Sequence, residues 1–505
     1  MITIDYLLKR TANKYPKKEA LVCDSKRISY EQFDQRANRL GNALTSWGVE
    51  KGDRVALLLY NSRELAEGIF GIARAGAIGV PLNYRLKPNE LAYILNHSGS
   101  KVLLYGSEFS EQALPLHKLT ELEKFICIEG SGPDIGYEEL LSQFSGTSPP
   151  FKIGEDDPAA LLYTSGTTGR PKGVVITHRN QIWACVSQTI EYGVTHRDRV
   201  LITAPMFHTG AFSRFLTAVY LGNSIFILKQ FDPVKFLQLV ETEEITFTSL
   251  VPTMFIMVDQ LPQEVKRSFQ TTSVEKYITS GSILPVELVR KIQNLFPRAQ
   301  IRDSYGATEF NFTTVLQPED FLRKIGSVGR AHVNSEVRIL NDRGTEMSPG
   351  EVGEICVRGP HVMKEYYRDP EATREAFTEG WFRTGDLGRM DAEGFFYIVD
   401  RKKDMIISGG ENIYPREIEE VLYTHEKIAE AAVIGVPDSI WGESVRAIVV
   451  TKPGERLTEG EVINFCAQRL AGYKKPKSVI FVDFLPKNTS SKILKKTLKE
   501  QFGKL

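Results

Sequence analysis

The sequence predicts a protein of the α/β class, in which parallel-rich sheets are layered with helices over most of the chain. Three observations lead to this prediction. Short apolar runs alternate with helix-length segments up to about residue 335, short strands between glycine and aspartate turns follow, and a charged, glycine-rich stretch begins at Asp400. We therefore expect a large N-terminal domain over 1–400, with a small β-rich subdomain at about 335–400, and a small α+β C-terminal domain over 401–505.

The segment after Ser29 is the first strongly predicted helix. It opens with Ser-x-x-Gln, the pattern of a capping box, and Gly48 ends it. Between them, apolar residues recur three and four positions apart, which predicts an amphipathic helix with one face in the core. These residues are Phe33, Ala37, Leu40, Leu44 and Trp47.

Short β-rich runs alternate with further helical segments. Continuous apolar runs are typical of strands that are buried on both faces, as in parallel sheets with crossover helices. The predicted strands are Val55–Leu59, Ala77–Leu82, Lys101–Tyr105, Val200–Thr203, Ser224–Leu228, Ile245–Leu250 and Lys276–Thr279. Past Ser335, the runs EVRIL, EICVRG and FFYIV predict the strands of the β-rich segment.

Composition and charge narrow the function classes. The 505 residues include 63 basic and 63 acidic residues, so no overall field draws the chain to nucleic acid or to an anionic membrane. Residues 401–505 hold 18 basic and 14 acidic residues, a net charge of +4, which leaves −4 for residues 1–400. No apolar run approaches the roughly 20 residues of a membrane-spanning helix, and no signal peptide is evident. We expect a cytoplasmic protein, while a peripheral membrane contact of the basic N-terminal segment stays open.

Cysteine and histidine residues are scattered along the chain. The five cysteines are odd in number and far apart, which is typical of reduced core thiols. The eight histidines form no close pair of the kind that a zinc site uses. Any metal is therefore expected to be held by oxygen ligands.

A stretch rich in glycine and hydroxyl residues follows the apolar run at Leu161. Glycines let backbone N–H groups turn toward an anion, hydroxyls add donors, and a lysine adds a mobile positive charge, so the stretch indicates polyphosphate binding. It is not a Walker A loop, because Pro171 precedes the lysine and Gly173 follows it. A flexible polar surface loop is the alternative. The candidate phosphate-binding residues are Thr164, Ser165, Gly166, Thr167, Thr168, Gly169 and Lys172.

At this stretch the chain resembles the adenylate-forming superfamily, which contains acyl-CoA synthetases, luciferases and the adenylation domains of peptide synthetases. The resemblance runs from about Tyr6 to Lys499, with the family's motifs in the expected order. It implies an AMP-forming acid–CoA ligase that uses ATP, Mg²⁺ and CoA. It also implies that the small C-terminal domain is a mobile lid.

The motif YGATE at 305–309 combines an aromatic ring, a close-turning backbone, a hydroxyl and a carboxylate. Carboxylate and phosphate oxygens suit Mg²⁺, although the bare motif is also typical of a turn. The resemblance implies that Glu309 and Thr164 hold Mg²⁺, that Tyr305 lies against adenine, and that Thr308 contacts phosphate. It also places Gly281, Ser282, Ser304 and Gly306 around the nucleotide. At residues 280–283 this chain has SGSI, where the family usually has Gly-Gly-Ala-Pro.

A second carboxylate lies in the motif RTGD at 383–386. One carboxylate can accept hydrogen bonds from both hydroxyls of a ribose, and a turn or N-cap aspartate is the alternative. The resemblance implies the ribose role for Asp386, ribose and phosphate contact for Arg401, and a hinge near Lys403. It further implies that residues 408–412, which include Gly409 and Gly410, line a pantetheine channel. It also implies that Trp441, Tyr473 and Lys475 contact the CoA nucleotide.

The segment PMFHTG at 205–210 places an aromatic residue and a histidine after a predicted strand. The bare histidine is typical of a hydrogen-bonded core residue, whereas the resemblance implies that His208 lies in a pocket between carboxylate and thiol. No aspartate stands here to pair with an α-ammonium group, which disfavours amino acid substrates. The expected acyl pocket is apolar and offers no charge partner for a second carboxylate; its candidates are Phe207, Phe212, Phe215, Val251, Met254 and Phe255.

Near the C-terminus, the stretch PKNTSSKIL at 486–494 enters a basic segment. Such a basic run is usually a solvated face, but the resemblance matches Lys492 to the family's catalytic lysine, where an ammonium bridges a carboxylate and an α-phosphate. The family usually has glycine at Ser491. The candidate catalytic residues are thus Lys492, Glu309, Thr164 and His208.

The predicted function is ligation of a medium- or long-chain fatty acid to CoA through an acyl-AMP. An aryl acid, cinnamate-like or succinylbenzoate, is the nearest alternative substrate. An ATPase or kinase, a nucleotide-binding protein without chemistry, and a loader of a carrier protein are the other classes considered. The oligomeric state, monomer or homodimer, is left open.

Overall fold

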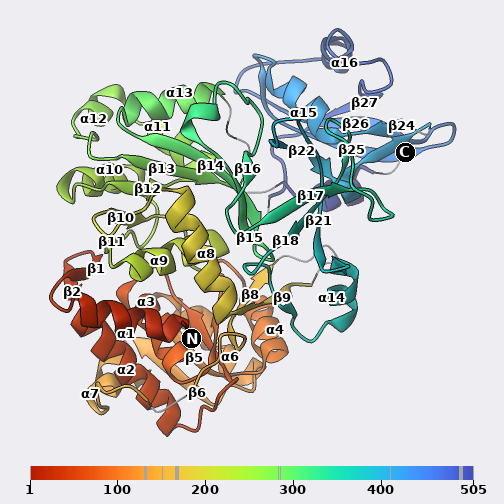
Figure 1. Ribbon diagram of the computed structural model, residues 1–505. Helices are drawn as coiled ribbons and strands as arrows, with labels where there is room; N and C mark the ends of the chain where they lie inside the picture. The colour runs from red at the N-terminus through yellow and green to blue at the C-terminus, as the bar shows by residue number, and fades with distance from the viewer. Residues whose placement is uncertain are drawn as a thin grey trace. The chain divides into compact units, whose positions relative to one another are not determined.

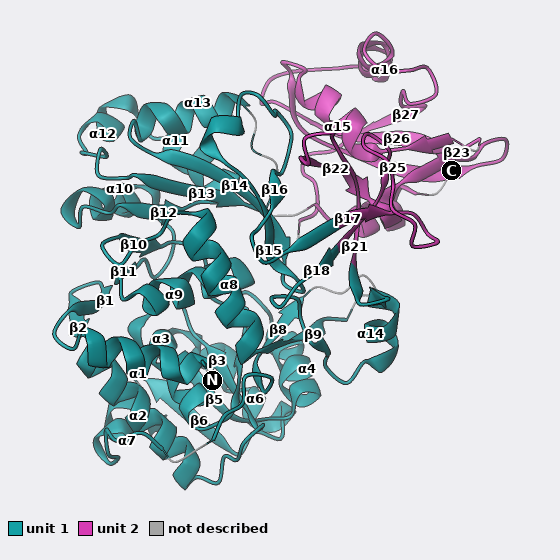
Figure 2. Ribbon diagram, in the orientation of Figure 1, with its two compact units in different colours: residues 1–337, 357–382 teal, residues 338–356, 383–505 magenta. Residues whose placement is uncertain are grey.

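The structure is a computed structural model that describes residues 2–129, 134–149, 152–164, 170–281, 284, 286–409, 411–487 and 493–503. These residues form two compact units (Figure 2). Unit 1 comprises residues 1–337 and 357–382, and unit 2 comprises residues 338–356 and 383–505. The division falls within the β-rich segment, so the boundary at residue 400 and the hinge near Lys403 stay predictions.

The first sheet of unit 1 has the strand order β16-β15-β14-β13-β12-β10-β11-β1-β2. Its neighbours from β14 through β13, β12, β10 and β11 to β1 are all parallel, so the carboxyl ends of these strands lie at one edge. The strands are β1 (Glu19–Cys23), β2 (Lys26–Ser29), β10 (Arg199–Ile202), β11 (Ser224–Ile227), β12 (Phe247–Ser249), β13 (Lys276–Ser280), β14 (Gln300–Ala307), β15 (Asn311–Leu316) and β16 (Arg330–Ala331).

The second sheet of unit 1 has the order β19-β9-β8-β4-β3-β5-β6-β7. Pairing is parallel from β8 through β4, β3, β5 and β6 to β7, whereas β9 pairs antiparallel with both β8 and β19. The strands are β3 (Arg54–Leu58), β4 (Ile78–Pro81), β5 (Ser100–Gly106), β6 (Lys124–Ile128), β7 (Ile135–Gly136), β8 (Pro158–Thr164), β9 (Lys172–Thr177) and β19 (Glu365–Tyr366).

Helices follow most of these strands and pack beside the sheets; in Figure 1, α10 to α13 lie along β12, β13 and β14. The predicted helix after Ser29 is confirmed as α2, with the capping box between Ser29 and Gln32, and Gly48 follows it at φ +79°. The helices of unit 1 are α1 (Ile4–Lys14), α2 (Tyr30–Ser46), α3 (Arg63–Arg74), α4 (Pro88–Ser98), α5 (Ser110–Ala113), α6 (Leu116–Leu119), α7 (Tyr137–Ser142), α8 (His178–Glu191), α9 (Thr209–Leu221), α10 (Pro233–Thr242), α11 (Pro252–Asp259), α12 (Gln263–Arg267), α13 (Val286–Leu295) and α14 (Pro370–Ala376).

The predicted α/β class is confirmed, and each predicted parallel strand is present. The run Ile245–Leu250 forms only the short strand β12, because only Phe247–Ser249 pair with the neighbouring strands β10 and β13. The three β-rich runs past Ser335 are strands as well. The strands of this segment are β17 (Glu336–Leu340), β18 (Gly353–Arg358), β20 (Phe377–Thr378), β21 (Trp381–Met390) and β22 (Phe396–Arg401).

The remainder of unit 2 has a core of its own. A sheet of order β24-β23-β26-β25, with β27 beside β26, packs its apolar face on helices α15 and α16. Ile406, Ile418, Val433 and Val445 are among the buried residues. The elements are β23 (Ile406–Ser408), β24 (Glu411–Ile413), α15 (Pro415–Tyr423), β25 (Ile428–Asp438), β26 (Gly442–Thr451), α16 (Glu459–Ala467), β27 (Ser478–Phe481) and α17 (Lys495–Phe502).

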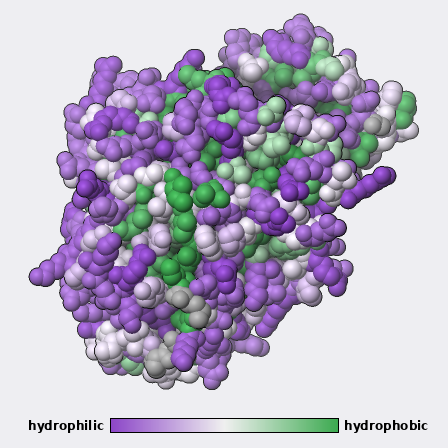
Figure 3. All heavy atoms as spheres, in the orientation of Figure 1, coloured by the Kyte–Doolittle hydropathy of each residue, from purple (hydrophilic) through white to green (hydrophobic). Residues whose placement is uncertain are grey.

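The five cysteines are free and buried, as the sequence predicts. Across the residues that the structure describes, no helix is both long and apolar enough to cross a membrane. Figure 3 shows apolar side chains on the face that carries α8, whose exposed Trp183 and Ile190 lie about two helical turns apart.

Candidate active site

The predicted phosphate-binding stretch joins β8 to β9. These two strands form an antiparallel pair in which Thr164 is directly opposite Lys172. The hairpin thus holds the first and last residues of the candidate loop side by side at the end of a buried strand. The intervening candidates Ser165, Gly166, Thr167, Thr168 and Gly169 lie outside the described residues.

The YGATE motif forms the end of β14 and the turn into β15. Gly306 is required there, because a Cβ atom would lie only 1.8 Å from the carbonyl oxygen of Asn311. Asn311 itself closes the turn at φ +46°. This tight hairpin holds Thr308 and Glu309 at its tip, half-buried, while the Tyr305 ring packs 5.5 Å from that of Phe310.

Tyr366 connects this hairpin to the first one. Its hydroxyl donates a hydrogen bond to Glu309 Oε1 at 3.0 Å, and the ammonium of Lys172 lies 5.0 Å from the centre of its ring. Lys172 is also 3.8 Å from Asp369. Tyr366 could not be predicted from the sequence, because its placement depends on the pairing of β19 with β9, where Tyr366 is opposite Val174.

Glu309 and Thr164 fit the chemistry of a Mg²⁺ site as far as the described residues allow. A carboxylate and a hydroxyl are hard oxygen ligands, and Mg²⁺ in phosphate-handling enzymes commonly takes one or two carboxylates and completes its shell with phosphate and water. Within the described ranges, no group of three or more histidine, cysteine, aspartate or glutamate residues is placed to hold a metal. The described residues therefore do not form a metal site built from protein ligands alone.

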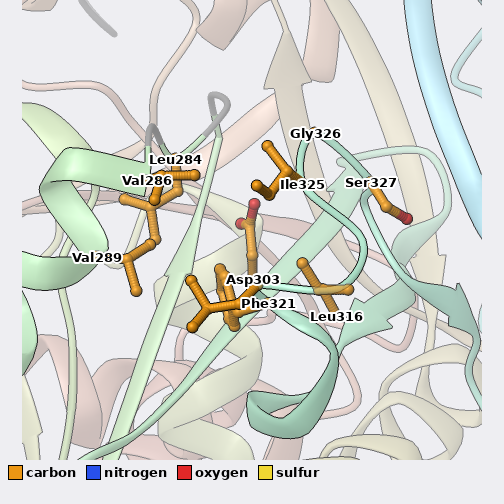
Figure 4. A pocket seen from close by; sticks show the side chains of 10 residues that line it. Leu284, Val286, Val289, Asp303, Leu316, Phe321, Ile325, Gly326 and Ser327 are labelled. Carbon is orange, nitrogen blue, oxygen red and sulfur yellow. The ribbon is translucent and has the colours of Figure 1, made fainter.

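Asp303 precedes Tyr305 by two positions on β14 and points into a small, mainly apolar pocket (Figure 4). Leu284, Val286, Leu316 and Ile325 are among its neighbours. Burial raises the pKa of the Asp303 carboxyl to about 7, and a hydrogen bond from the backbone of Ser304 opposes the shift. A carboxyl group that is close to half protonated at neutral pH thus lies next to the predicted adenine contact.

Ser304 faces the interior. Its hydroxyl lies 2.9 Å from that of Tyr192, and both residues are buried. A nucleotide contact by Ser304 would therefore use its backbone, and this role stays a prediction. Gly281 directly follows the neighbouring strand β13 and has φ +90°, which only glycine adopts easily. The candidate Ser282 lies outside the described residues.

His208 is the N-cap residue of α9, at the carboxyl edge of the first sheet. Its ring packs 4.3 Å from that of Phe207. Asn61 holds the preceding turn, because its side-chain amide donates to the carbonyl of Ala204 at 2.9 Å and accepts from the backbone N–H of Met206 at 2.8 Å. His208 is half-buried, so its position is compatible with the predicted pocket role.

The apolar candidates divide into two groups. Phe215 packs on Phe70, and Phe255 packs on Tyr277, so both belong to the core. Phe212 is also buried. Phe207, Val251 and Met254 are only half-buried and follow the carboxyl ends of β10 and β12.

In unit 2, Asp386 and Arg401 are paired across β21 and β22. Arg401 Nε donates to Asp386 Oδ1 at 2.7 Å, and the two residues are opposite each other in the strand register. Glu354 fixes the approach to Asp386, since its buried carboxylate accepts from the Arg383 guanidinium at 2.5 Å and from the backbone N–H of Gly385 at 3.1 Å. Glu354 could not be predicted from the sequence, because it is 29 residues from Arg383 along the chain.

Two other candidates of unit 2 also meet. The backbone N–H of Gly409 donates to the carbonyl of Trp441 at 2.8 Å, and a Cβ atom on Gly409 would lie 2.6 Å from the indole ring. Lys403 is exposed in a short 3₁₀ turn. Gly410 and Lys492 lie outside the described residues, although Lys487 and Ile493, on either side of the latter, form a β-bridge.

Unit 1 therefore carries polar groups at the carboxyl ends of neighbouring parallel strands, with a glycine-rich hairpin, a carboxylate at a turn and a lysine beside them. This arrangement defines a nucleotide-binding enzyme of the α/β class. Comparison with known families takes the assignment further. Residues 8–367 match the AMP-binding enzyme family, and residues 417–492 match the C-terminal domain of the AMP-binding enzymes.

Known proteins match over their full length. The long-chain-fatty-acid–CoA ligase FadD13 of Mycobacterium tuberculosis is 39% identical over 508 aligned positions, covering 100% of this chain and 99% of the relative. Feruloyl-CoA synthase of Amycolatopsis sp is 38% identical, with 98% of each chain covered. The solved O-succinylbenzoate coenzyme A synthetase of Bacillus subtilis, in complex with ATP and a magnesium ion, has a TM-score of 0.86 at 33% identity and covers 98% of this chain and 99% of its own.

The chain belongs to the AMP-binding enzyme family, which confirms the resemblance to the adenylate-forming superfamily. It is an ATP-dependent acid–CoA ligase. The family assignment does not extend to single residues, so the roles of the candidate site residues stay predictions.

Proposed function

We propose that the acid is a fatty acid of medium or long chain. The observation that supports this proposal is the set of half-buried apolar residues Phe207, Val251 and Met254 at the carboxyl edge of the first sheet. Val251 lies next to Gly281, because a Cβ atom added to Gly281 would be 3.9 Å from Val251 Cγ1. The missing side chain at Gly281 leaves room for an acyl chain beside this apolar group. The name of the Mycobacterium tuberculosis relative agrees with such a substrate.

An aryl acid is the second candidate. Flat rings and alkyl chains are equally suited to an apolar pocket. The feruloyl-CoA and O-succinylbenzoate relatives are 38% and 33% identical to this chain, against 39% for the fatty-acid relative. The buried Arg214 on α9 favours this alternative where the aryl acid carries a second oxygen acceptor, as 2-succinylbenzoate does.

For the first half-reaction, we propose that a carboxylate oxygen of the acid attacks the α-phosphorus of ATP and that pyrophosphate leaves. Lys172 and the hydroxyl and backbone groups of the β8–β9 hairpin bind the departing phosphates, and Lys492 bridges the carboxylate and the α-phosphate. Glu309, with Thr164, holds Mg²⁺, which neutralises phosphate charge when bound. Tyr366 positions Glu309 through its hydrogen bond. Placement and electrostatics supply most of the rate enhancement in such a step.

The nucleoside is assigned to Tyr305 on the adenine side and to Asp386 and Arg401 on the ribose side. In the second half-reaction, the CoA sulfur attacks the acyl carbon, AMP leaves with the carboxylate oxygen, and the thiol proton passes to solvent. We propose that the C-terminal domain turns near Lys403 between the steps, which withdraws Lys492 and brings Gly409 and Trp441 to the CoA. A cytoplasmic location stays a prediction.

Pyrophosphate release over a panel of acids, with and without CoA, tests this function. We expect acid-dependent pyrophosphate and AMP, with a higher kcat/KM for the fatty acids from octanoate to palmitate than for cinnamate. A higher kcat/KM for the aryl acids would replace the fatty-acid proposal with the second candidate. Production of ADP in place of AMP would mark an ATPase or a kinase and overturn both.

A further inference from the structure

Arg214 is a cation buried in the interior of unit 1. It lies on α9, within the largely apolar run AFSRFLTAV, and only 6% of the residue is exposed. Burial lowers the pKa of its guanidinium, although a guanidinium stays protonated in proteins. A charge in such a place is strongly unfavourable unless it is paired and hydrogen-bonded.

The guanidinium reaches back toward the start of α9, at the carboxyl edge of the first sheet. Its Nη2 donates to Ser280 Oγ at 3.2 Å, at the end of β13, and its carbon lies 4.7 Å from the centre of the Phe312 ring. A Cβ atom on Gly210 would be 3.4 Å from Nη1. The glycine four residues earlier on the helix thus leaves the space that the guanidinium occupies.

These contacts leave most of the donors of Arg214 unused. Nε is buried without a hydrogen-bond acceptor, Nη1 donates no hydrogen bond, and no carboxylate pairs with the side chain anywhere in the described part of the chain. Ser280 is a neutral partner, and Phe312 offers only a ring face. The helix N-terminus of α9 carries a partial positive charge, which repels the guanidinium and so does not compensate its charge.

One hydroxyl on the same helix lacks a partner as well. Thr209 Oγ1, in the first turn of α9, is buried with no hydrogen-bond partner among the described residues. Buried polar groups without partners are rare in folded proteins and commonly mark a place that a ligand or water fills. The guanidinium can only donate and the hydroxyl can donate as well, so an oxygen-rich group would satisfy both.

The location points to the acid substrate as the source of that acceptor. Ser280, which Arg214 contacts, directly precedes Gly281, and Gly281 adjoins Val251 of the proposed apolar pocket. The strand register also puts Ser280 opposite Ser304, immediately before Tyr305. The guanidinium therefore lies beside the space assigned to the body of the acid.

We propose that Arg214 is a specificity-determining residue that binds an oxygen acceptor on the acid, remote from the carboxylate that reacts. A second carboxylate is the strongest match, because the planar guanidinium presents paired donors that fit its two oxygens. This proposal rests on the acid–CoA ligase activity, and it refines the fatty-acid proposal to a chain that carries an oxygen acceptor at its far end. It differs from the sequence-based expectation of a pocket with no partner for a second carboxylate.

Matched acids test the proposal. Octanedioate and octanoate have equal length and differ in the terminal carboxylate, and 4-carboxycinnamate and cinnamate differ in the same way. We expect the wild-type enzyme to prefer the acceptor-bearing acid of each pair in kcat/KM for pyrophosphate release. In Arg214→Met, which keeps an apolar stem, we expect the acceptor-bearing acids to lose about 100-fold while the plain acids lose little. For Arg214→Lys we expect an intermediate loss in kcat/KM for the acceptor-bearing acids, since lysine keeps the positive charge but lacks the paired donors of the planar guanidinium.

Arg290→Met is the matched control, because Arg290 is exposed on α13. It should leave every ratio unchanged. A wild-type enzyme that prefers the plain acids, or an Arg214→Met enzyme that loses equally on both members of each pair, would overturn the proposal. Calorimetric binding of octanedioate against octanoate to the wild-type protein decides the matter even where a variant does not fold. If no acid yields AMP and pyrophosphate but octanedioate binds more tightly, the ligase assignment fails and the role of Arg214 as a binding residue stands.

Discussion

Tyr366 donates a hydrogen bond to Glu309 at 3.0 Å, across 57 residues of sequence. The ring that carries this hydroxyl also faces the ammonium of Lys172. One side chain therefore contacts both the carboxylate proposed for Mg²⁺ and the lysine proposed for the phosphates. Both contacts exist because β19 adds to the edge of β9, so the two hairpins and Tyr366 are positioned as a set.

Substitution Tyr366→Phe removes the hydrogen bond and keeps the ring. A hydrogen bond to a charged group contributes about 1.5 kcal/mol or more, so we expect about a 10-fold decrease in acid-dependent exchange of pyrophosphate into ATP, with a higher Mg²⁺ requirement. Tyr367→Phe is the control, since the hydroxyl of Tyr367 donates to the carbonyl of Ser98 instead. Equal effects of the two substitutions, or an unchanged Mg²⁺ dependence, would show that Tyr366 does not act through Glu309.

Asp386→Asn keeps the shape of the proposed ribose ligand and removes its charge. Arg401 then loses its ion pair at 2.7 Å, and one acceptor oxygen becomes an amide donor. We expect weaker ATP binding and a decrease of roughly 100-fold in both half-reactions, because a nucleotide is bound in each. Asp342→Asn, at an exposed carboxylate of the same unit, should have little effect. Normal ATP binding by Asp386→Asn would remove Asp386 from the site.

The buried carboxyl of Asp303 predicts a pH dependence of stability. In the folded protein it keeps its proton up to about pH 7, whereas an unfolded aspartate loses it near pH 4. Between these values the folded state binds the additional proton, so this group lowers the free energy of unfolding as pH rises, by up to about 1.4 kcal/mol per pH unit. Asp303→Asn removes this contribution.

Urea denaturation at a series of pH values measures the effect. Relative to the wild type, Asp303→Asn should become progressively more stable from pH 4 to pH 7 and show no further relative change well above pH 7. Glu121→Gln, at an exposed position, should follow the wild type throughout. Parallel curves for Asp303→Asn and wild type over this window would contradict the raised pKa.

Lys492→Ala separates the two half-reactions. The ammonium is proposed to act only while the acyl-AMP forms, so we expect adenylation to fall by roughly 1,000-fold, while thioester formation from supplied acyl-AMP and CoA stays within a few-fold of wild type. Rapid-quench measurement of each half-reaction gives both rates. A comparable loss in both would contradict the assignment of Lys492 to one step and the domain movement linked to it.

The layered fold and its main strands could be predicted from sequence because their signals are local. Continuous apolar runs of strand length, the capping box at Ser29 and the glycine at Gly48 each act within one element. The carboxyl edge that carries His208, Gly281 and Tyr305 follows once these strands are taken as parallel. The motif at 305–309 could be placed in a turn for the same reason.

The residues that sequence reasoning missed depend on contacts between distant segments. Tyr366 meets Glu309 only through the β19–β9 pairing, and Glu354 meets Arg383 only through strand packing. Arg214 did leave a local signal, an arginine within an apolar helix four residues after a glycine. The meaning of that signal depends on Ser280 and Phe312, which come from other strands.

The fate of an oxygen atom tests the central claim most directly. Octanoate labelled with oxygen-18 in its carboxylate is incubated with the protein, ATP, Mg²⁺ and CoA, and the products are analysed by mass spectrometry. The account predicts AMP that carries one labelled oxygen, because the oxygen that attacks the α-phosphorus stays with AMP when the thiol displaces it. Unlabelled AMP, or label in orthophosphate together with ADP, would contradict the acyl-AMP and with it the proposed mechanism.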